Sequence, residues 1–240
     1  MKVEIWSDYV CPFCYIGKKK FEAALEKFAH KDKIETTFRS FELDPGADSN
    51  SNVSTFSMLA SKYGMSIEQA KASTVSVAQQ AAAVGLAFRF EGTVETNTFD
   101  AHRMVHFAAG HGKDKELSER LFKAHFTDGI NIGQRERLIE LCAEVGLPAD
   151  EAAAALQSGL HADVVREEEE EGSRLGIRGV PFYVIDRKYA VSGAQSPEVF
   201  LDALNKAWEE KYPTLVQVEA GNPDAMCADG VCAPKREPQS

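Results

Sequence analysis

The sequence lacks long apolar runs and any excess of positive charge. No stretch of the 240 residues approaches the roughly 18 apolar residues that a membrane-spanning helix needs. The net charge at pH 7 is −10, and an acidic protein is repelled by the phosphates of nucleic acids and of anionic lipids. We therefore expect a protein that binds neither nucleic acid nor membrane.

A secretory signal is also missing, and cysteine is scarce. Residues 1–5 contain neither the basic segment nor the apolar segment that opens such a signal. The chain has five cysteines, and in a reducing compartment cysteines serve catalysis or redox sensing more often than a disulfide framework. We therefore expect a cytoplasmic protein.

Two cysteines, Cys11 and Cys14, enclose a Cys-Pro-Phe-Cys motif where a strand is followed by a helix. The helix is indicated by apolar residues spaced along one face, Phe21, Leu25 and Phe28. Pro12 falls at the first helical position, where its missing N–H costs nothing. A sulfur at a helix N-terminus faces unpaired N–H groups and the positive end of the helix dipole, which favour the thiolate. We predict that Cys11 is the exposed nucleophile and Cys14 the covered resolving thiol.

Other interpretations of the motif are half of a zinc site, a structural disulfide or two buried thiols. Zinc needs two further ligands at a suitable spacing. His102 and His106 share one helical face but have no obvious third ligand, so we expect satisfied or solvent-facing histidines and no metal. A Cys-X-X-Cys at a strand-to-helix junction is instead typical of a redox site.

The ends of the chain predict strands, and the middle predicts helices. A strand at 34–43 completes a βαβ unit, while strands at 180–185 and 188–192 with a helix from 197 form a ββα unit. The helices expected between the two units cover 56–64, 67–84, 99–109, 116–126, 134–145, 150–157 and 161–175. We predict an α/β thioredoxin-like fold with a large all-helical insertion between the βαβ and ββα halves.

This pattern divides the chain into three parts. Residues 1–45 and 162–212 form the thioredoxin-like domain, 46–161 the inserted helical domain and 213–240 a flexible tail. The tail holds Cys227 and Cys232, which we interpret either as a second redox pair or as idle thiols. Cys142 lies in an apolar helix and should be an inert buried thiol. The acidic run at 167–171 should face solvent.

Pro181 opens a predicted strand, where proline is normally confined to edges or bulges. In a thioredoxin-like frame it would be a cis proline beside the Cys-X-X-Cys motif. Its neighbour Val180 would then offer backbone groups to an extended substrate. We predict that Val180, Pro12 and Phe13 contact the substrate.

Four motifs in order resemble the DsbA-like thioredoxin superfamily, and its FrnE-like branch most. They are Ser7-Asp8-x-x-Cys11-Pro12-x-Cys14, Asn97-Thr98-x-x-Ala101-His102-Arg103, Gly179-Val180-Pro181-Phe182 and Ser192-Gly193-Ala194-Gln195. The resemblance implies thiol–disulfide oxidoreductase activity, with Cys11 as nucleophile, Cys14 as resolving thiol and Pro181 as cis proline. Strongly oxidising DsbA proteins carry histidine where this chain has Phe13. We therefore expect a less oxidising site, that is, a reductase or an isomerase.

Three other functions stay open at this point. The sequence also resembles the kappa-class glutathione transferases and 2-hydroxychromene-2-carboxylate isomerases, although these normally have serine where Cys11 stands. A peptide-binding chaperone, or a tailoring enzyme for a small aromatic compound, is a further alternative. We expect protein or small-molecule disulfides or thiols as partners, a recycling reductant such as glutathione but no resident cofactor, and a monomer or homodimer.

Overall fold

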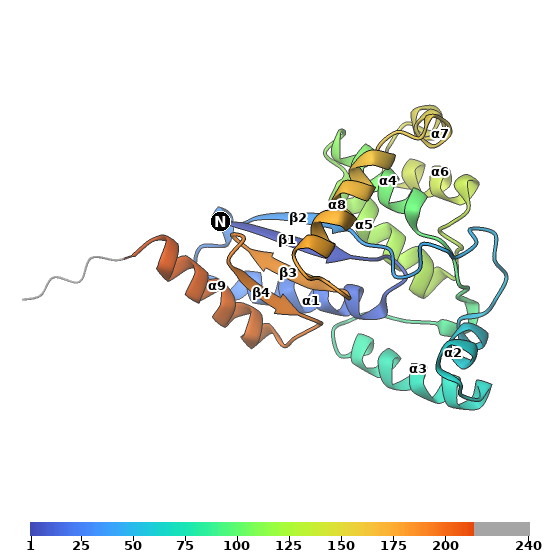
Figure 1. Ribbon diagram of the computed structural model, residues 1–240, viewed down its shortest axis with the longest axis horizontal. Coiled ribbons are helices and arrows are strands. Elements are labelled where there is room, and N and C mark those ends of the chain that lie inside the picture. Colours follow the sequence, from blue (N-terminus) through green and yellow to red (C-terminus); the bar gives the residue numbers. More distant parts are fainter. Residues whose placement is uncertain (214–240) are drawn as a thin grey trace, which may run out of the picture.

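The computed structural model describes residues 1–213, which are built around a mixed four-stranded sheet (Figure 1). Its order is β2-β1-β3-β4, with β1 and β2 parallel and the other pairs antiparallel. The strands are β1 (Lys2–Ser7), β2 (Glu35–Ser40), β3 (Phe182–Ile185) and β4 (Tyr189–Ser192). A parallel pair needs a crossover connection, and α1 (Pro12–Lys27) provides it between β1 and β2. The predicted βαβ and ββα units are confirmed.

The chain between β2 and β3 is helical, as predicted, and α9 (Pro197–Lys211) follows β4. The intervening helices are α2 (Thr55–Tyr63), α3 (Ile67–Ala82), α4 (Phe99–Ala109), α5 (Asp114–Lys123), α6 (Arg135–Glu144), α7 (Ala149–Ser158) and α8 (Ala162–Arg174). Within residues 1–213, no helix is long and apolar enough to cross a bilayer. The exact domain boundaries stay a prediction, and Cys227 and Cys232 lie outside the described residues.

Apolar side chains join the sheet to its helices on both faces. On one face α1 and α9 pack against Val3, Ile5 and Tyr183, while α8 covers the other face around Trp6 (Figure 1). A third and larger cluster includes Cys11 and Cys14 together with buried residues from α3 to α7. The insertion and the start of α1 therefore share one core, and the two thiols lie within it.

The strand β2 is shorter than the predicted 34–43, because backbone donors at its last residue and beyond it bind carboxylates. The N–H of Ser40 donates to Oε2 of Glu168 at 2.7 Å, and the N–H of Leu43 donates to Oδ2 of Asp8 at 2.7 Å. These groups are therefore unavailable to a strand ladder. The segment after Ser40 turns away toward the insertion.

Glu168 corrects the prediction that the whole acidic run faces solvent. Its side chain is only 5 % exposed, and it accepts hydrogen bonds from Arg39 and from the N–H of Ser40, with Nε2 of His106 3.1 Å away. Burial alone would raise the pKa of Glu168, but hydrogen bonds from His106 and Arg39 lower it to about 2. This carboxylate fastens α8 to β2 and α4, and His106 is satisfied as expected.

Gly17 marks the closest approach of α1 to the strand pair β3 and β4. A Cβ at this position would lie 2.7 Å from the hydroxyl oxygen of Tyr183 and 3.1 Å from Cγ of Pro181. We predict that Gly17→Ala lowers the free energy of unfolding by about 1–3 kcal/mol, because both neighbours are held by packing. Urea unfolding measures the difference.

The matched control is Gly179→Ala, where a Cβ would meet nothing within 4 Å. Its free energy of unfolding should stay within about 0.5 kcal/mol of the wild type. Equal stabilities of the two variants would show that α1 can shift to accommodate the methyl group.

Candidate active site

The two thiols lie at the junction between β1 and α1, as predicted. Cys11 is the N-cap residue of α1 with extended backbone angles, and Pro12 occupies the first helical turn. The N–H of Cys11 donates to the carbonyl of Asp8, and the N–H of Cys14 donates to the carbonyl of Cys11, each at 3.1 Å. Both sulfurs are unbridged thiols in this structure.

The prediction that Cys11 is exposed is wrong. Its exposed fraction is 4 % and that of Cys14 is 2 %, whereas the intervening Phe13 is 39 % exposed. The insertion covers the start of α1, which a local sequence pattern cannot show. Cys11 nevertheless lines a cavity of about 390 Å³, and Cys14 does not. Cys11 is therefore the more accessible of the two thiols, as expected, but a substrate reaches it through a cavity and not from an open surface.

The segment before β3 faces Cys11. The Val180–Pro181 peptide bond is cis, as predicted. The thiol of Cys11 donates to the carbonyl of Val180 with a sulfur–oxygen distance of 3.6 Å, while the carbonyl of Pro181 accepts from the N–H of Gly193 at 2.8 Å. The structure thus brings Cys11, Cys14, Val180 and Pro181 together from opposite ends of the chain.

The environment of Cys14 favours its protonated form. Burial raises the pKa of Cys14 well above the usual thiol value, and the adjacent Cys11 acts in the same direction. The hydroxyl of Ser7 and the N–H of Asp8, which lies 3.5 Å from the sulfur, act in the opposite direction. Cys14 is therefore a weak nucleophile at neutral pH until the surroundings of its sulfur change.

Asp8 and His102 form a buried pair behind the thiols. Asp8 is fully buried, and its Oδ1 lies 3.6 Å from Nε2 of His102, which is 3 % exposed. Within residues 1–213 neither of these two atoms has a hydrogen-bond partner. The expectation that His102 is satisfied or solvent-facing is therefore wrong, because α4 brings it against the end of β1.

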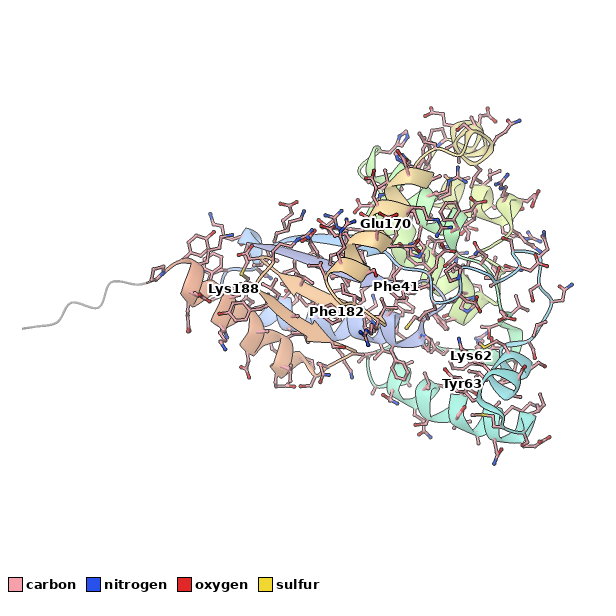
Figure 2. The ribbon with its side chains drawn as sticks, viewed as in Figure 1. Phe41, Lys62, Tyr63, Glu170, Phe182 and Lys188 are labelled. Carbon is pink, nitrogen blue, oxygen red and sulfur yellow. The ribbon has the colours of Figure 1, made fainter. Side chains whose placement is uncertain are left out.

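The cavity beside Cys11 lies between the start of α1, the helix pair α2–α3 and the turn Ala124–Asp128 that follows α5. Lys62 and Tyr63 project from α2, which forms its outer wall (Figure 2). Only three residues of the lining are of a charged type: Asp44, Lys62 and Glu95. Most of the lining is apolar: Val10, Leu43, Met58, Leu59, Val77, Phe90, Val94, Phe126 and Val180, together with Cys11, Pro12 and Phe13.

His125, to which the sequence assigned no role, also lines this cavity. The helix predicted at 116–126 ends at Lys123, and a π-helical turn follows at Ala124–Asp128. His125 is 4 % exposed, and its Nδ1 has no hydrogen-bond partner within the described chain. Burial lowers the pKa of His125 to about 4, against the opposing effect of Asp8. The ring is therefore neutral at pH 7.

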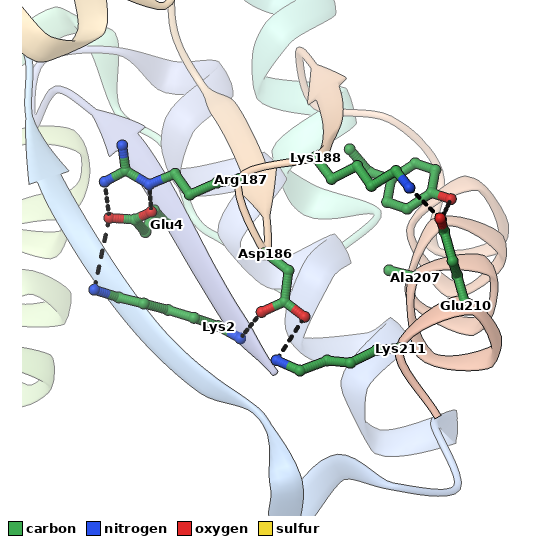
Figure 3. A pocket seen from close by; sticks show the side chains of 9 residues that line it. Lys2, Glu4, Asp186, Arg187, Lys188, Ala207, Glu210 and Lys211 are labelled. Carbon is green, nitrogen blue, oxygen red and sulfur yellow. Dashed lines mark hydrogen bonds and ion pairs between the residues drawn. The ribbon is translucent and has the colours of Figure 1, made fainter. Parts of the chain in front are cut away.

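A larger cavity of about 660 Å³ lies at the opposite ends of the strands, beside Lys2. Figure 3 shows that its charged groups form ion pairs with one another: Glu4–Arg187, Asp186–Lys211 and Lys188–Glu210. Charges that neutralise each other in this way fasten β3 and β4 to α9 and β1. We assign this cavity a structural role.

The remaining candidates contribute no chemistry in the described range. Cys142 is fully buried as predicted, and burial raises its pKa to about 12. Between residues 1 and 213, no three His, Cys, Asp or Glu side chains are grouped so that they could hold a metal ion. Resident metal chemistry therefore has no candidate site in this part of the chain.

Paired thiols at the start of α1, opposite a cis proline on a four-stranded sheet, define a thioredoxin-like thiol protein. Residues 2–205 match the model of the DSBA-like thioredoxin domain, and the chain belongs to this family. The family is that of DsbA-like thiol oxidoreductases, which confirms the resemblance and the fold inferred from the four motifs. The FrnE-like branch stays a prediction.

Relatives of known structure or sequence agree with this assignment. A probable DsbA oxidoreductase from Streptomyces coelicolor is 46% identical, with a TM-score of 0.85 over 93% of this chain and 97% of that one. The uncharacterized protein YwbO of Bacillus subtilis is 28% identical over 87% of this chain and 98% of its own length. The cytosolic disulfide reductase DsbM of Pseudomonas aeruginosa, 18% identical, shares the fold with a TM-score of 0.61 over 88% of this chain and 100% of its own.

The neutral His125 gives a prediction for stability against pH. Its pKa is about 4 in the folded protein and about 6.5 when unfolded, so between these values the unfolded state binds more protons and stability falls as pH falls. Between pH 7 and pH 5 the wild type should lose about 2 kcal/mol more stability than His125→Asn. Denaturant titrations at the two pH values measure this difference.

The exposed His111 provides the control, since His111→Asn should follow the wild type at both pH values. An equal loss of stability between pH 7 and pH 5 in the wild type and in His125→Asn would contradict the prediction. It would mean that the His125 ring binds its proton as readily in the folded chain as in the unfolded chain.

Proposed function

We propose that this protein is a thiol–disulfide oxidoreductase that reduces or isomerises disulfides of proteins or small molecules. The observation that supports it most is the arrangement of Cys11, which faces both the 390 Å³ cavity and the carbonyl of Val180, with Cys14 covered behind it. A substrate sulfur can therefore reach Cys11 and not Cys14. This asymmetry is what a nucleophile and a resolving thiol require.

The reaction proceeds in two exchanges. The thiolate of Cys11 attacks one sulfur of the substrate disulfide, forming a mixed disulfide and releasing the other sulfur as a thiolate. Cys14 then loses its proton and attacks the sulfur of Cys11, which forms the Cys11–Cys14 disulfide and releases the second substrate thiolate. A thiol reductant restores both cysteines, and its electrons balance the cycle.

Residues around Cys11 hold the substrate in this proposal. Phe13 is exposed and lines the cavity together with Pro12, while Val180 turns its carbonyl toward the reacting sulfur. Formation of the mixed disulfide ends the contact between the thiol hydrogen of Cys11 and that carbonyl. The backbone beside Pro181 can then bind an extended segment of the substrate.

We place the protein among cytoplasmic reductases that recycle through a small thiol. Phe13 cannot stabilise a thiolate as an imidazole would, so the reduced form is less favoured and the Cys11–Cys14 disulfide should be a weaker oxidant than in dedicated oxidants. DsbM, which shares the fold, is a cytosolic disulfide reductase and was also solved with glutathione. Glutathione is accordingly the first reductant to test.

The 2-hydroxychromene-2-carboxylate isomerase type is the second candidate. A solved isomerase of this type has the same fold at 14% identity, with a TM-score of 0.64. The pair Cys11 and Cys14 counts against it, because a glutathione-dependent isomerase has no need for a resolving thiol. A chaperone-like function would require aggregation suppression that survives Cys11→Ser.

The two thiols should respond differently to substitution. Cys11→Ser should abolish disulfide reduction at this site, because the covered Cys14 cannot reach the substrate, whereas Cys14→Ser should accumulate the mixed disulfide at Cys11. Mass spectrometry of each variant after incubation with a disulfide of known mass gives the measurement. An adduct on Cys14 in the Cys11→Ser protein would reverse the proposed roles, and Cys142→Ser is the unreactive control.

Phe13 should set the balance between oxidation and reduction. Against glutathione buffers we expect a reduction potential between about −200 and −270 mV for the wild type, the range of glutaredoxins and thioredoxin. Phe13→His should shift it toward the roughly −120 mV of strong oxidants. Alkylation of the remaining thiols followed by mass spectrometry gives the ratio of reduced to oxidised protein. A wild-type potential already near −120 mV would contradict the reductase proposal.

A further inference from the structure

One buried hydroxyl near the thiols is unpaired in the described chain. The side chain of Tyr183 is 0 % exposed, and its ring packs against Phe21 and Phe200 at centroid distances of 5.3 and 4.6 Å. Within residues 1–213 its hydroxyl oxygen makes no hydrogen bond. A buried hydroxyl in that state lowers stability, and phenylalanine would fill the same place without this cost. The hydroxyl therefore needs an explanation other than packing.

The hydroxyl lies against α1, on the helix face that carries Cys14. Tyr183 is paired with Ile5 of β1, and its oxygen is 2.7 Å from the point where Gly17 would carry a Cβ. Gly17 follows Cys14 by three residues, and residues with this spacing are neighbours on one helix face, with about 5–6 Å between their Cβ positions. The oxygen is therefore about one helical turn from the resolving thiol.

The phenol stays protonated in this position. Burial raises the pKa of Tyr183 well above its usual value, and negative charge on Cys14, Cys11 or Glu22 acts in the same direction. Its O–H is therefore a hydrogen-bond donor at neutral pH. Since no acceptor among the described residues takes this donor in the reduced protein, it can turn toward a charge that forms during the reaction.

The resolving step creates such a charge. Cys14 must become a thiolate before it can attack, and burial opposes this change. Two neutral donors favour the thiolate, the hydroxyl of Ser7 and the N–H of Asp8. A further donor is worth most where water is excluded, because a hydrogen bond to a charged group strengthens in a low-dielectric site.

We infer that the hydroxyl of Tyr183 donates to the sulfur of Cys14 in the resolving step and thereby stabilises its thiolate. The proton of Cys14 passes to solvent, the bond between the sulfurs of Cys14 and Cys11 forms, and the bond from Cys11 to the substrate sulfur breaks. The electron pair of that bond leaves with the substrate thiolate, and Tyr183 keeps its own proton. The inference rests on the proposed function, since it concerns the second of its two exchanges.

Tyr183→Phe removes the hydroxyl alone. The reduced wild type and the reduced variant are mixed with one equivalent of 2,2′-dithiodipyridine and quenched with acid at intervals. Mass spectrometry of the peptide that carries Cys11 and Cys14 then separates two processes. Growth of the pyridylthio adduct measures the attack by Cys11, and conversion of the adduct to the Cys11–Cys14 disulfide measures the attack by Cys14.

The variant should be slower in the conversion only. Loss of one donor should raise the pH at which the conversion is half-maximal by about one unit. The fraction of thiolate at neutral pH then falls about tenfold, but each thiolate is about threefold more nucleophilic, so the conversion slows by about threefold. The adduct should grow at the wild-type rate, because Cys11 faces the carbonyl of Val180.

The urea midpoint gives a second, independent result. It should rise in Tyr183→Phe, because the variant loses an unpaired buried hydroxyl and keeps the ring. The other titratable groups around the two side chains are the same in both proteins, so the pH shift reports the hydroxyl; they are Cys11, Glu22, Asp8 and His102.

Tyr189→Phe is the matched control. The hydroxyl of Tyr189 donates to Glu210 and lies at the other end of the pair β3 and β4. Its removal should leave the conversion rate and the pH of half-maximal conversion as they are in the wild type.

Three results for Tyr183→Phe would overturn the inference alone. The first is an unchanged conversion rate with an unchanged pH dependence. The second is a lower urea midpoint, which would show that the hydroxyl is paired in the reduced protein. The third is an equal slowing of adduct growth and of conversion, which would indicate a general disturbance of the site. Absence of any adduct on Cys11 in the wild type would instead contradict the proposed function, and the inference with it.

Discussion

The burial of Asp8 is the constraint on which the site depends. This one residue donates its N–H to the sulfur of Cys14, accepts from the N–H of Leu43 and lies beside His102. These contacts join the end of β1 to the resolving thiol, to the segment that leads into the insertion and to α4. A carboxyl group buried this completely needs polar neighbours, so the position of Cys14 and the path of the chain after β2 are fixed together.

The shared core of the insertion and α1 determines how the thiols are reached. A thioredoxin-like sheet alone would leave the start of α1 open, but here the same apolar cluster contains Cys11 and residues from six helices of the insertion, α2 to α7. Cys11 is therefore covered and opens only toward a cavity. The motif places the two thiols, and the helices that enclose it shape the one cavity to which Cys11 opens.

Much of the fold was readable from the sequence because it depends on local patterns. The helix at 99–109 was predicted at its observed bounds, and the cis proline was expected once Pro181 was placed in a thioredoxin-like frame. What was missed depends on tertiary contacts between distant segments. Glu168 faces inward only because Arg39 and His106 come from other elements, and a π-helical turn at His125 leaves no period in the sequence to detect.

The two sides of the cavity differ in how firmly they are held. In α2 only Phe56 is buried, and Tyr63 and Val75 on the helix pair α2–α3 are 62% and 56% exposed. Elements with few buried apolar contacts open at low free energy, so this wall can adjust to occupants of different shape. His125 and Phe126 on the opposite side are almost fully buried and cannot follow. The cavity therefore has one wall that can yield, formed by α2 and α3, and one wall that keeps its shape.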